Sequence, residues 1–185
     1  MLIKERVTYL KSMKKLMAGL LAVMMVICML PIRAAAAEKD FFYFAASTDS
    51  KLVAAPEKVY YTEGQSIKEA LQGSGHTFKG IEEDWIEKID DVQGNYVRTD
   101  ENGGYSMDRP ASEVKFFCFS EKEGFLTESR QALVKAMADY LDEEKDVQAA
   151  AKAEYDAAVS GYAAADDEAA AKLSADINAA IESYK

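Results

Sequence analysis

Aromatic residues and alanines divide this sequence into two unlike parts. Of the 18 aromatic residues that follow residue 37, 14 lie before residue 126, whereas residues 149–185 contain 15 alanines in 37 positions. Aromatic side chains favour strands, and alanine has the highest helix propensity. The sequence therefore predicts an α+β protein, with a small β-rich domain at 38–125 and an alanine-rich helical extension at 126–185.

An export signal is predicted at residues 1–37. Lys11, Lys14 and Lys15 precede an uncharged run of 17 residues, Leu16 to Ile32, and an alanine cluster ends at Ala37. A basic region, an apolar region and small residues in this order are typical of a cleaved signal peptide. We expect cleavage after Ala36 or Ala37 and a secreted or cell-surface protein. The alternative is an uncleaved anchor, which would be the chain's only contact with a membrane.

The remaining chain is strongly acidic. Residues 38–185 contain 16 Lys and Arg against 31 Asp and Glu, a net charge of about −15. Phosphate backbones repel such a surface, so we expect no nucleic-acid partner. Cys118 is the one cysteine in this part, which excludes an internal disulfide.

Strands are predicted where aromatic and β-branched residues gather. Residues 40–46 form one such run, and residues 52–61 form a second that Pro56 interrupts or bends. Residues 95–98 and the nearly continuous apolar run 114–119 indicate two further strands, the last of them buried.

A short helix is predicted from Ser66 to Gln72. Ser66 and Glu69 have the spacing of a capping box, and an apolar face follows at helical spacing. Gly73 is expected to end the helix in a left-handed conformation.

Longer helices are predicted after Thr127. One apolar stripe runs from Leu133 to Leu141, and a second segment contains Tyr155 and Tyr162. An acidic run at residues 166–168 begins the last helix, as the helix dipole favours. The last two stripes, joined near residues 164–167, predict an antiparallel helical hairpin.

Residues 56–71 resemble a known family. The segment Pro56 to Leu71 is similar to the "P-x-x-V-x-V-x-E-G-x-T-v-x-d-a-L" motif of exported domains that are similar to the transcobalamin C-terminal domain. Residues 86–92 resemble the same domains' "f-I-x-x-I-d-G-v" segment, with Asp91 at the usual glycine. The resemblance covers about residues 40–120. It implies a β-grasp fold on a Gram-positive surface protein and, as in some members, a corrinoid ligand.

The alanine-rich tail has a weaker resemblance. Its helices are similar to the FIVAR-type spacer modules of Gram-positive surface proteins, on the strength of Tyr155, Leu173, Ile177 and Tyr184. This resemblance implies a helical spacer.

Aromatic side chains are the candidate ligand-binding residues. Trp85, Tyr96 and Tyr105 lie in the part richest in turns, where they could form a platform for a sugar or a flat ligand. The alternative is that they belong to the core or to half-buried strands.

Oxygen ligands around a glycine turn suggest a candidate calcium site. Asp100, Asn102 and Asp108 surround the Gly103-Gly104 turn, but their spacing differs from that of an EF-hand. The alternative is a polar hairpin loop.

Catalytic chemistry is not indicated. His76, the one histidine, follows the Gly73-Ser74-Gly75 segment and is expected in an exposed loop, with no nucleophile motif before Ser74. Cys118 is expected to be a buried, unreactive thiol. Pairs of carboxylates are expected by chance in a chain this acidic.

The sequence thus predicts a non-enzymatic, exported envelope protein without a cofactor. It would act as a binding or spacer module whose partner is a surface protein, a glycan or a small molecule. The alternative is a carrier of a corrinoid-like ligand. Self-association through the helical hairpin is also open.

Overall fold

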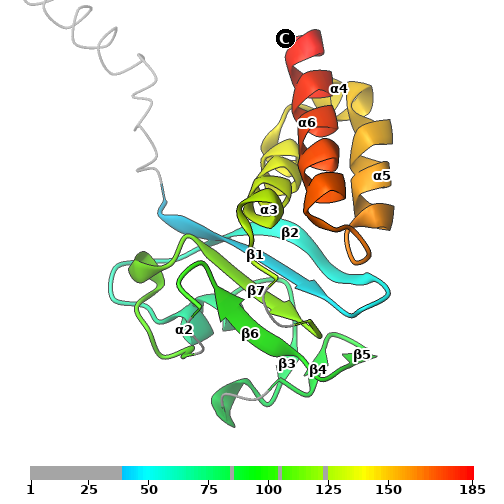
Figure 1. Ribbon diagram of the computed structural model, residues 1–185. Helices are drawn as coiled ribbons and strands as arrows, with labels where there is room; N and C mark the ends of the chain where they lie inside the picture. Colours follow the sequence, from blue (N-terminus) through cyan, green and yellow to red (C-terminus); the bar gives the residue numbers. More distant parts are fainter. Residues whose placement is uncertain (1–38, 84–85, 104–105, 123–124) are drawn as a thin grey trace, which may run out of the picture. The chain divides into compact units, whose positions relative to one another are not determined.

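A mixed four-stranded sheet forms the centre of the structure (Figure 1). The computed structural model describes residues 39–185 except 84–85, 104–105 and 123–124, so the predicted signal at 1–37 lies outside the described residues. Residues 39–185 form one unit that includes the sheet and all the described helices. Within this part of the chain, each helix is too short or too polar to cross a bilayer.

The strand order of this sheet is β2-β1-β7-β6. The strands are β1 (Phe41–Ser47), β2 (Leu52–Tyr60), β6 (Val97–Asp100) and β7 (Phe116–Ser120). The central pair β1 and β7 is parallel, and β2 and β6 pair antiparallel on the two outer sides. A smaller antiparallel sheet contains β3 (Phe78–Lys79), β4 (Lys88–Ile89) and β5 (Val92–Gln93). All four strand regions predicted from the sequence are present in the large sheet, with bounds shifted by at most two residues.

Both faces of the central strands are covered. Phe42, Phe44 and Phe117 belong to one core, together with the residues of the short helix α2. Ala45 and Cys118, which alternate with them along the strands, belong to a second core with the C-terminal helices. Successive side chains of a strand point to opposite faces, so the sheet separates two hydrophobic cores. This explains why residues 114–119 are nearly continuously apolar.

The short helix α2 (Ile67–Gln72) confirms the predicted capping box. Ser66 Oγ accepts a hydrogen bond from the Glu69 N–H, and the Glu69 carboxylate accepts one from the Ser66 N–H. Ile67, Ala70 and Leu71 are buried against the sheet. The prediction for Gly73 is wrong: its φ is −84°, and its N–H continues the helical hydrogen bonding to Glu69 and Ala70. Helix α2 therefore ends in a right-handed turn.

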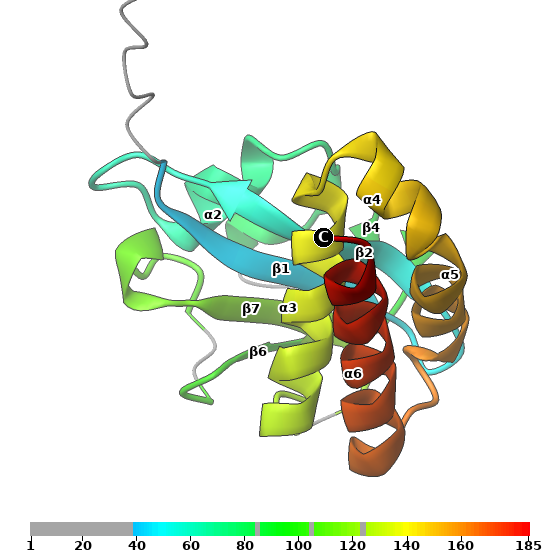
Figure 2. The ribbon, with the colours of Figure 1, turned by 90° about the horizontal axis from the view of Figure 1, so that it is seen from above.

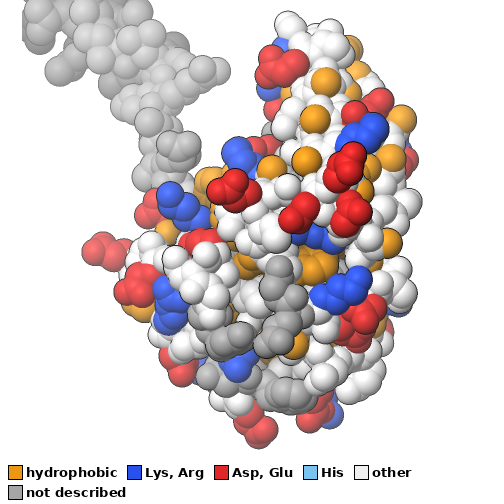
Figure 3. Space-filling model, viewed as in Figure 1, with side chains coloured by type: hydrophobic (Ala, Val, Ile, Leu, Met, Phe, Trp, Pro, Cys, Tyr) orange, Lys and Arg blue, Asp and Glu red, His pale blue; other side chains and the backbone are white. Residues whose placement is uncertain are grey.

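The C-terminal helices form a layer on the other face of the sheet (Figures 1 and 2). They are α3 (Glu128–Asp142), α4 (Lys145–Ala150), α5 (Lys152–Gly161) and α6 (Asp167–Tyr184). Thr127 and Asp166 cap the N-termini of α3 and α6, at the predicted starting points. The sequence predicts a hairpin extension; in the structure α5 packs along α6, but α3 packs on β1, β2 and α6, and α5 also contacts β2, so the helices are a layer on the sheet. Acidic and basic side chains are interspersed over this side of the molecule (Figure 3).

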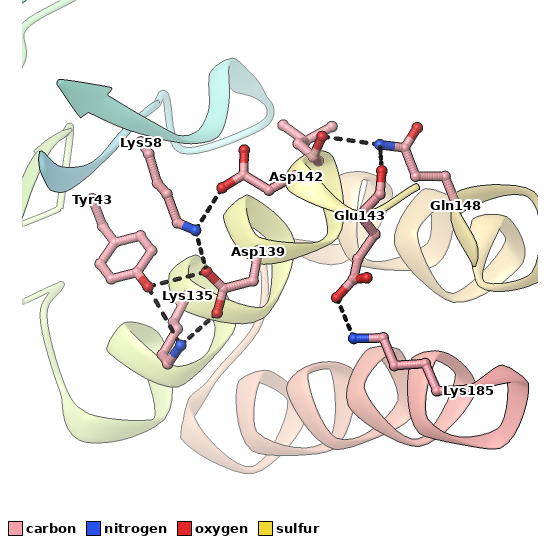
Figure 4. A network of polar contacts seen from close by, with 9 residues as sticks. Tyr43, Lys58, Lys135, Asp139, Asp142, Glu143, Gln148 and Lys185 are labelled. Carbon is pink, nitrogen blue, oxygen red and sulfur yellow. Dashed lines mark hydrogen bonds and ion pairs between the residues drawn. The ribbon is translucent and has the colours of Figure 1, made fainter. Parts of the chain in front are cut away.

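A polar network joins the helical layer to the outer strand (Figure 4). Lys58 of β2 contacts the carboxylates of Asp139 and Asp142 on α3, the first at 3.0 Å. Tyr43 of β1 donates a hydrogen bond to Asp139, and Lys135 of α3 contacts both. The two carboxylates raise the pKa of Lys58 although burial opposes the charged form, so Lys58 stays protonated in the folded protein.

A buried arginine connects the helices to one another. Arg130 of α3 is 4% exposed, and its guanidinium donates hydrogen bonds to the carbonyl oxygens of Tyr162 and Ala165, after the end of α5. The guanidinium also lies 4.0 Å from the centre of the Phe125 ring and 4.9 Å from that of Tyr162. Orphan carbonyls at a helix C-terminus need such donors when water cannot reach them.

We expect Arg130→Ala to destabilise the folded protein by about 3 kcal/mol, because two buried carbonyl groups lose their donor and a cavity forms. Chemical denaturation of residues 38–185 measures this change. Lys152→Ala is the matched control, since it removes an exposed cation paired only with Asp156 and should leave the midpoint unchanged. Equal midpoints for both variants would contradict the anchoring role of Arg130.

We also expect residues 38–125 to lose cooperative folding without the helices. Removal of α3–α6 would expose the sheet face that carries Tyr43, Ala45, Phe116 and Cys118. Thermal unfolding followed by circular dichroism tests this, with residues 38–185 as the reference. A sharp transition in the shortened chain would show that the β-rich half is an independent domain.

Candidate functional site

The one histidine lies between two carboxylates from distant segments. His76 Nδ1 is 2.7 Å from Asp90 Oδ2, and His76 Nε2 is 3.4 Å from Glu57 Oε1. His76 follows α2, Glu57 belongs to β2, and Asp90 lies in the turn between β4 and β5. His76 lies in a loop, as predicted, but only 20% of its side chain is accessible. The fold thus assembles a carboxylate–imidazole–carboxylate cluster.

Asp90 is held in place by its backbone conformation and by three atoms that hydrogen-bond to its carboxylate. It is the one non-glycine residue with positive φ, 51°, in the described ranges, a conformation that aspartate tolerates better than most residues. Its carboxylate accepts hydrogen bonds from the Thr77 N–H at 2.8 Å and the Thr77 hydroxyl. Burial raises the pKa of Asp90, but the hydrogen bonds from Thr77 and His76 outweigh burial, so the pKa lies below its ordinary value. Asp90 is therefore the fixed anion that orients the imidazole.

Glu57 is the less satisfied carboxylate. Burial raises its pKa above the ordinary value, His76 opposes this, and the charge of Asp90 adds to it. Its Oε1 atom is buried and accepts no hydrogen bond from the described residues, although His76 lies within ion-pair distance. A proton placed on either group improves the contact between Glu57 and His76. The buried oxygen of Glu57 therefore depends on His76 as its nearest donor within the described residues.

A cleft opens beside Glu57. It has a volume of about 200 Å³ and lies between β2 and the C-terminal end of α2. Its lining residues are Glu57, Lys58, Val59, Tyr60, Ala70, Gly73, Ser74 and Gly75. Ala70 and the two glycines present almost no side chain, which leaves the recess open. Ser74 Oγ accepts a hydrogen bond from the His76 N–H and so fixes the loop that carries the imidazole.

Of the three residues of the predicted aromatic platform, only Tyr96 lies among the described residues. Trp85 and Tyr105 lie outside the described residues. Tyr96 is 3% exposed and belongs to the core beneath the sheet, where its hydroxyl donates a hydrogen bond to the Val92 carbonyl. Its ring lies against Gly94, where a β-carbon would approach to 2.8 Å. Tyr96 therefore packs as the alternative interpretation expected.

Two of the three predicted calcium ligands, Asp100 and Asp108, form ion pairs within the protein. Asp100 forms an ion pair with Arg109, and Asp108 forms one with Lys68 at 2.9 Å. The Asn102 N–H donates to the Asp100 carboxylate at 2.8 Å, as in a polar turn. Within the described residues, no group of three or more acidic, histidine or cysteine side chains is arranged to hold a metal ion.

Cys118 lies in the core between the sheet and the helices. It is 1% exposed, and burial raises the pKa of its thiol to about 12. A thiol with this pKa is neutral at physiological pH and has little nucleophilic character.

Sequence reasoning did not find the cluster around His76. Glu57 and Asp90 lie 19 and 14 residues from His76 in the sequence, and no local motif marks them. The one available signal was that a single histidine occurs in an acidic chain.

No protein-family model, no curated protein and no solved structure matches this chain. Its function must therefore be argued from its own residues.

The two carboxylates should act oppositely on stability. Because the pKa of Glu57 is raised on folding, its ionisation destabilises the folded state above that pKa, and the penalty fades as the pH falls. Glu57→Gln should therefore raise the melting temperature at pH 7, and the gain should shrink below about pH 5. Thermal melts between about pH 3 and 7 measure this.

Asp90→Asn should have the reverse effect. The pKa of Asp90 is lowered on folding, so its stabilisation is present at neutral pH and is lost as the pH falls below the unfolded value of about 4. The variant should melt below the parent at pH 7 and converge with it at acid pH. A pH-independent difference for either variant would contradict the assigned charges.

Proposed function

We propose that this chain is an exported, non-enzymatic binding module of the bacterial cell envelope. The basic, apolar and alanine-rich pattern of residues 1–37 supports export. The acidic composition of residues 38–185 suits a soluble surface domain that does not bind nucleic acid or anionic lipid.

A β-grasp fold is part of this proposal. The parallel central pair β1 and β7, with β2 paired to β1 and helix α2 directly after β2, supports it. The covering helices α3–α6 would be an addition to that core. This arrangement agrees with the motif resemblance of residues 56–71 to domains of this fold.

The cleft beside Glu57 is the observation that favours a binding role over a spacer role. A spacer needs only a stable surface, whereas here a recess lies beside Glu57, whose buried Oε1 atom accepts no hydrogen bond from the described residues and has His76 Nε2 at 3.4 Å. Such an atom costs stability unless a partner supplies a donor. A binding role accounts for both the recess and the carboxylate beside it.

A corrinoid-like ligand is the alternative proposal. Sites for small organic ligands commonly have volumes of about 300–1,000 Å³, and the cleft, at about 200 Å³, is below that range. Tyr96 lies in the core, and the other two residues of the candidate platform, Trp85 and Tyr105, lie outside the described residues. Equilibrium dialysis against a corrinoid, read by its absorbance, would detect such binding.

Export should be visible as cleavage of the leader. We expect the chain, expressed in a Gram-positive host, to accumulate outside the membrane with Ala37 or Glu38 as its first residue. N-terminal sequencing of the cell-wall and medium fractions measures this. Leu21→Arg, which puts a charge in the apolar run, should keep the chain inside the cell. A full-length chain confined to the cytosol would refute the proposal.

A further inference from the structure

The cleft runs along a free edge of the large sheet. β2 is the outermost strand on its side, with β1 as its one neighbour (Figure 2). The Tyr61 N–H donates to the Asp40 carbonyl at 3.0 Å, next to the pair of Tyr60 and Phe41. Hydrogen-bonded and non-hydrogen-bonded pairs alternate along antiparallel strands. Glu57 and Val59 therefore direct their main-chain groups toward β1.

Lys58 and Tyr60 consequently direct their main-chain groups away from β1. Within the described residues, no hydrogen bond is made to their N–H groups from the outer side. Both residues line the cleft. An extended chain placed in the cleft could pair with these groups as a fifth strand, since unpaired donors and acceptors of an edge strand are a template for strand addition.

The far wall of the cleft leaves room for such a chain. Ala70, Gly73 and Gly75 contribute almost no side-chain volume there, and a β-carbon at Gly75 would meet no atom within 4 Å. Strands of one sheet lie about 4.8 Å apart, so an added strand needs an open margin of this kind.

The charges around the cleft determine which side chains of a partner it favours. The Glu57 side chain is 34% exposed and lines the cleft, its buried Oε1 atom lies 3.4 Å from His76 Nε2, and Asp90 adds a second negative charge behind His76. The ammonium group of Lys58 points to the opposite face of the sheet, where Asp139 and Asp142 hold it.

We propose that the β2 edge binds an extended peptide segment of a partner protein through strand addition, with a lysine or arginine of that segment paired to Glu57. The inference rests on the proposed binding function and names its partner class. Main-chain pairing to Lys58 and Tyr60 would supply affinity, and the Glu57 carboxylate would supply selectivity. Pro56, which has no N–H, would limit the pairing to the end of β2 beside the cleft.

The test uses residues 38–185, which contain both cores, and labelled peptides of about eight alternating threonines and valines. One peptide has lysine at a central position, and a second has norleucine there. Fluorescence anisotropy measures binding. We expect saturable binding of the lysine peptide and about tenfold weaker binding of the norleucine peptide, as a charge-assisted contact to a partly buried carboxylate implies.

Variants of the protein test the role of Glu57. Glu57→Gln should abolish the preference for lysine, whereas Glu144→Gln, a charge change at an exposed position on the helical layer, should preserve it. A circular dichroism melt confirms that both variants are folded. Equal affinity of the lysine and norleucine peptides for the parent protein would overturn the role of Glu57.

N-methylated lysine peptides test strand addition without changing the protein. Methylation of one set of alternate amides should abolish binding, and methylation of the other set should leave it within about twofold, because a paired strand uses one set only. Equal effects of the two sets, no binding of any peptide, or sedimentation that shows a β2-mediated dimer instead would overturn the proposal. Since export is measured separately, cleavage without peptide binding refutes this inference alone.

Discussion

The parallel pairing of β1 with β7 is the contact on which the remaining structure depends. These two strands place Phe44 beside Phe117 on one face and Ala45 beside Cys118 on the other. Each face carries its own hydrophobic core, one with α2 and one with α3–α6. Parallel strands are usually covered on both faces, and here one strand pair joins two segments that lie 73 residues apart in the sequence, as Tyr43 and Phe116 do.

The functional proposal depends on what this sheet leaves uncovered. Its faces are filled, whereas the outer side of β2 next to α2 remains a cleft. Lys58 and Asp139 fix β2 to the helical layer, and this bond turns the lysine away from the cleft. The cleft therefore stays acidic, with Glu57 as the carboxylate that faces it. Along β2, residues that contact the helical layer alternate with residues on the side of α2.

The sequence predicted features that arise from neighbouring residues. The capping box of Ser66 and Glu69, the caps at Thr127 and Asp166 and the buried run of β7 all follow from local patterns. Features that need distant partners were missed. The contacts of His76 and the packing of α3 on the sheet depend on register and topology, which no window of the sequence contains. Gly73 shows that even a local rule fails when the helix can end in a right-handed turn.

Residue-resolved hydrogen exchange of residues 38–185 tests the account most directly. A single unit built on β1 and β7 predicts that the slowest amides of β1, β7 and α3 exchange with one common free energy of opening. The free edge predicts alternation along β2, with slow exchange at Glu57 and Val59 and fast exchange at Lys58 and Tyr60. Separate free energies for the strands and the helices would contradict the shared sheet, and protected amides at Lys58 and Tyr60 would contradict the open edge.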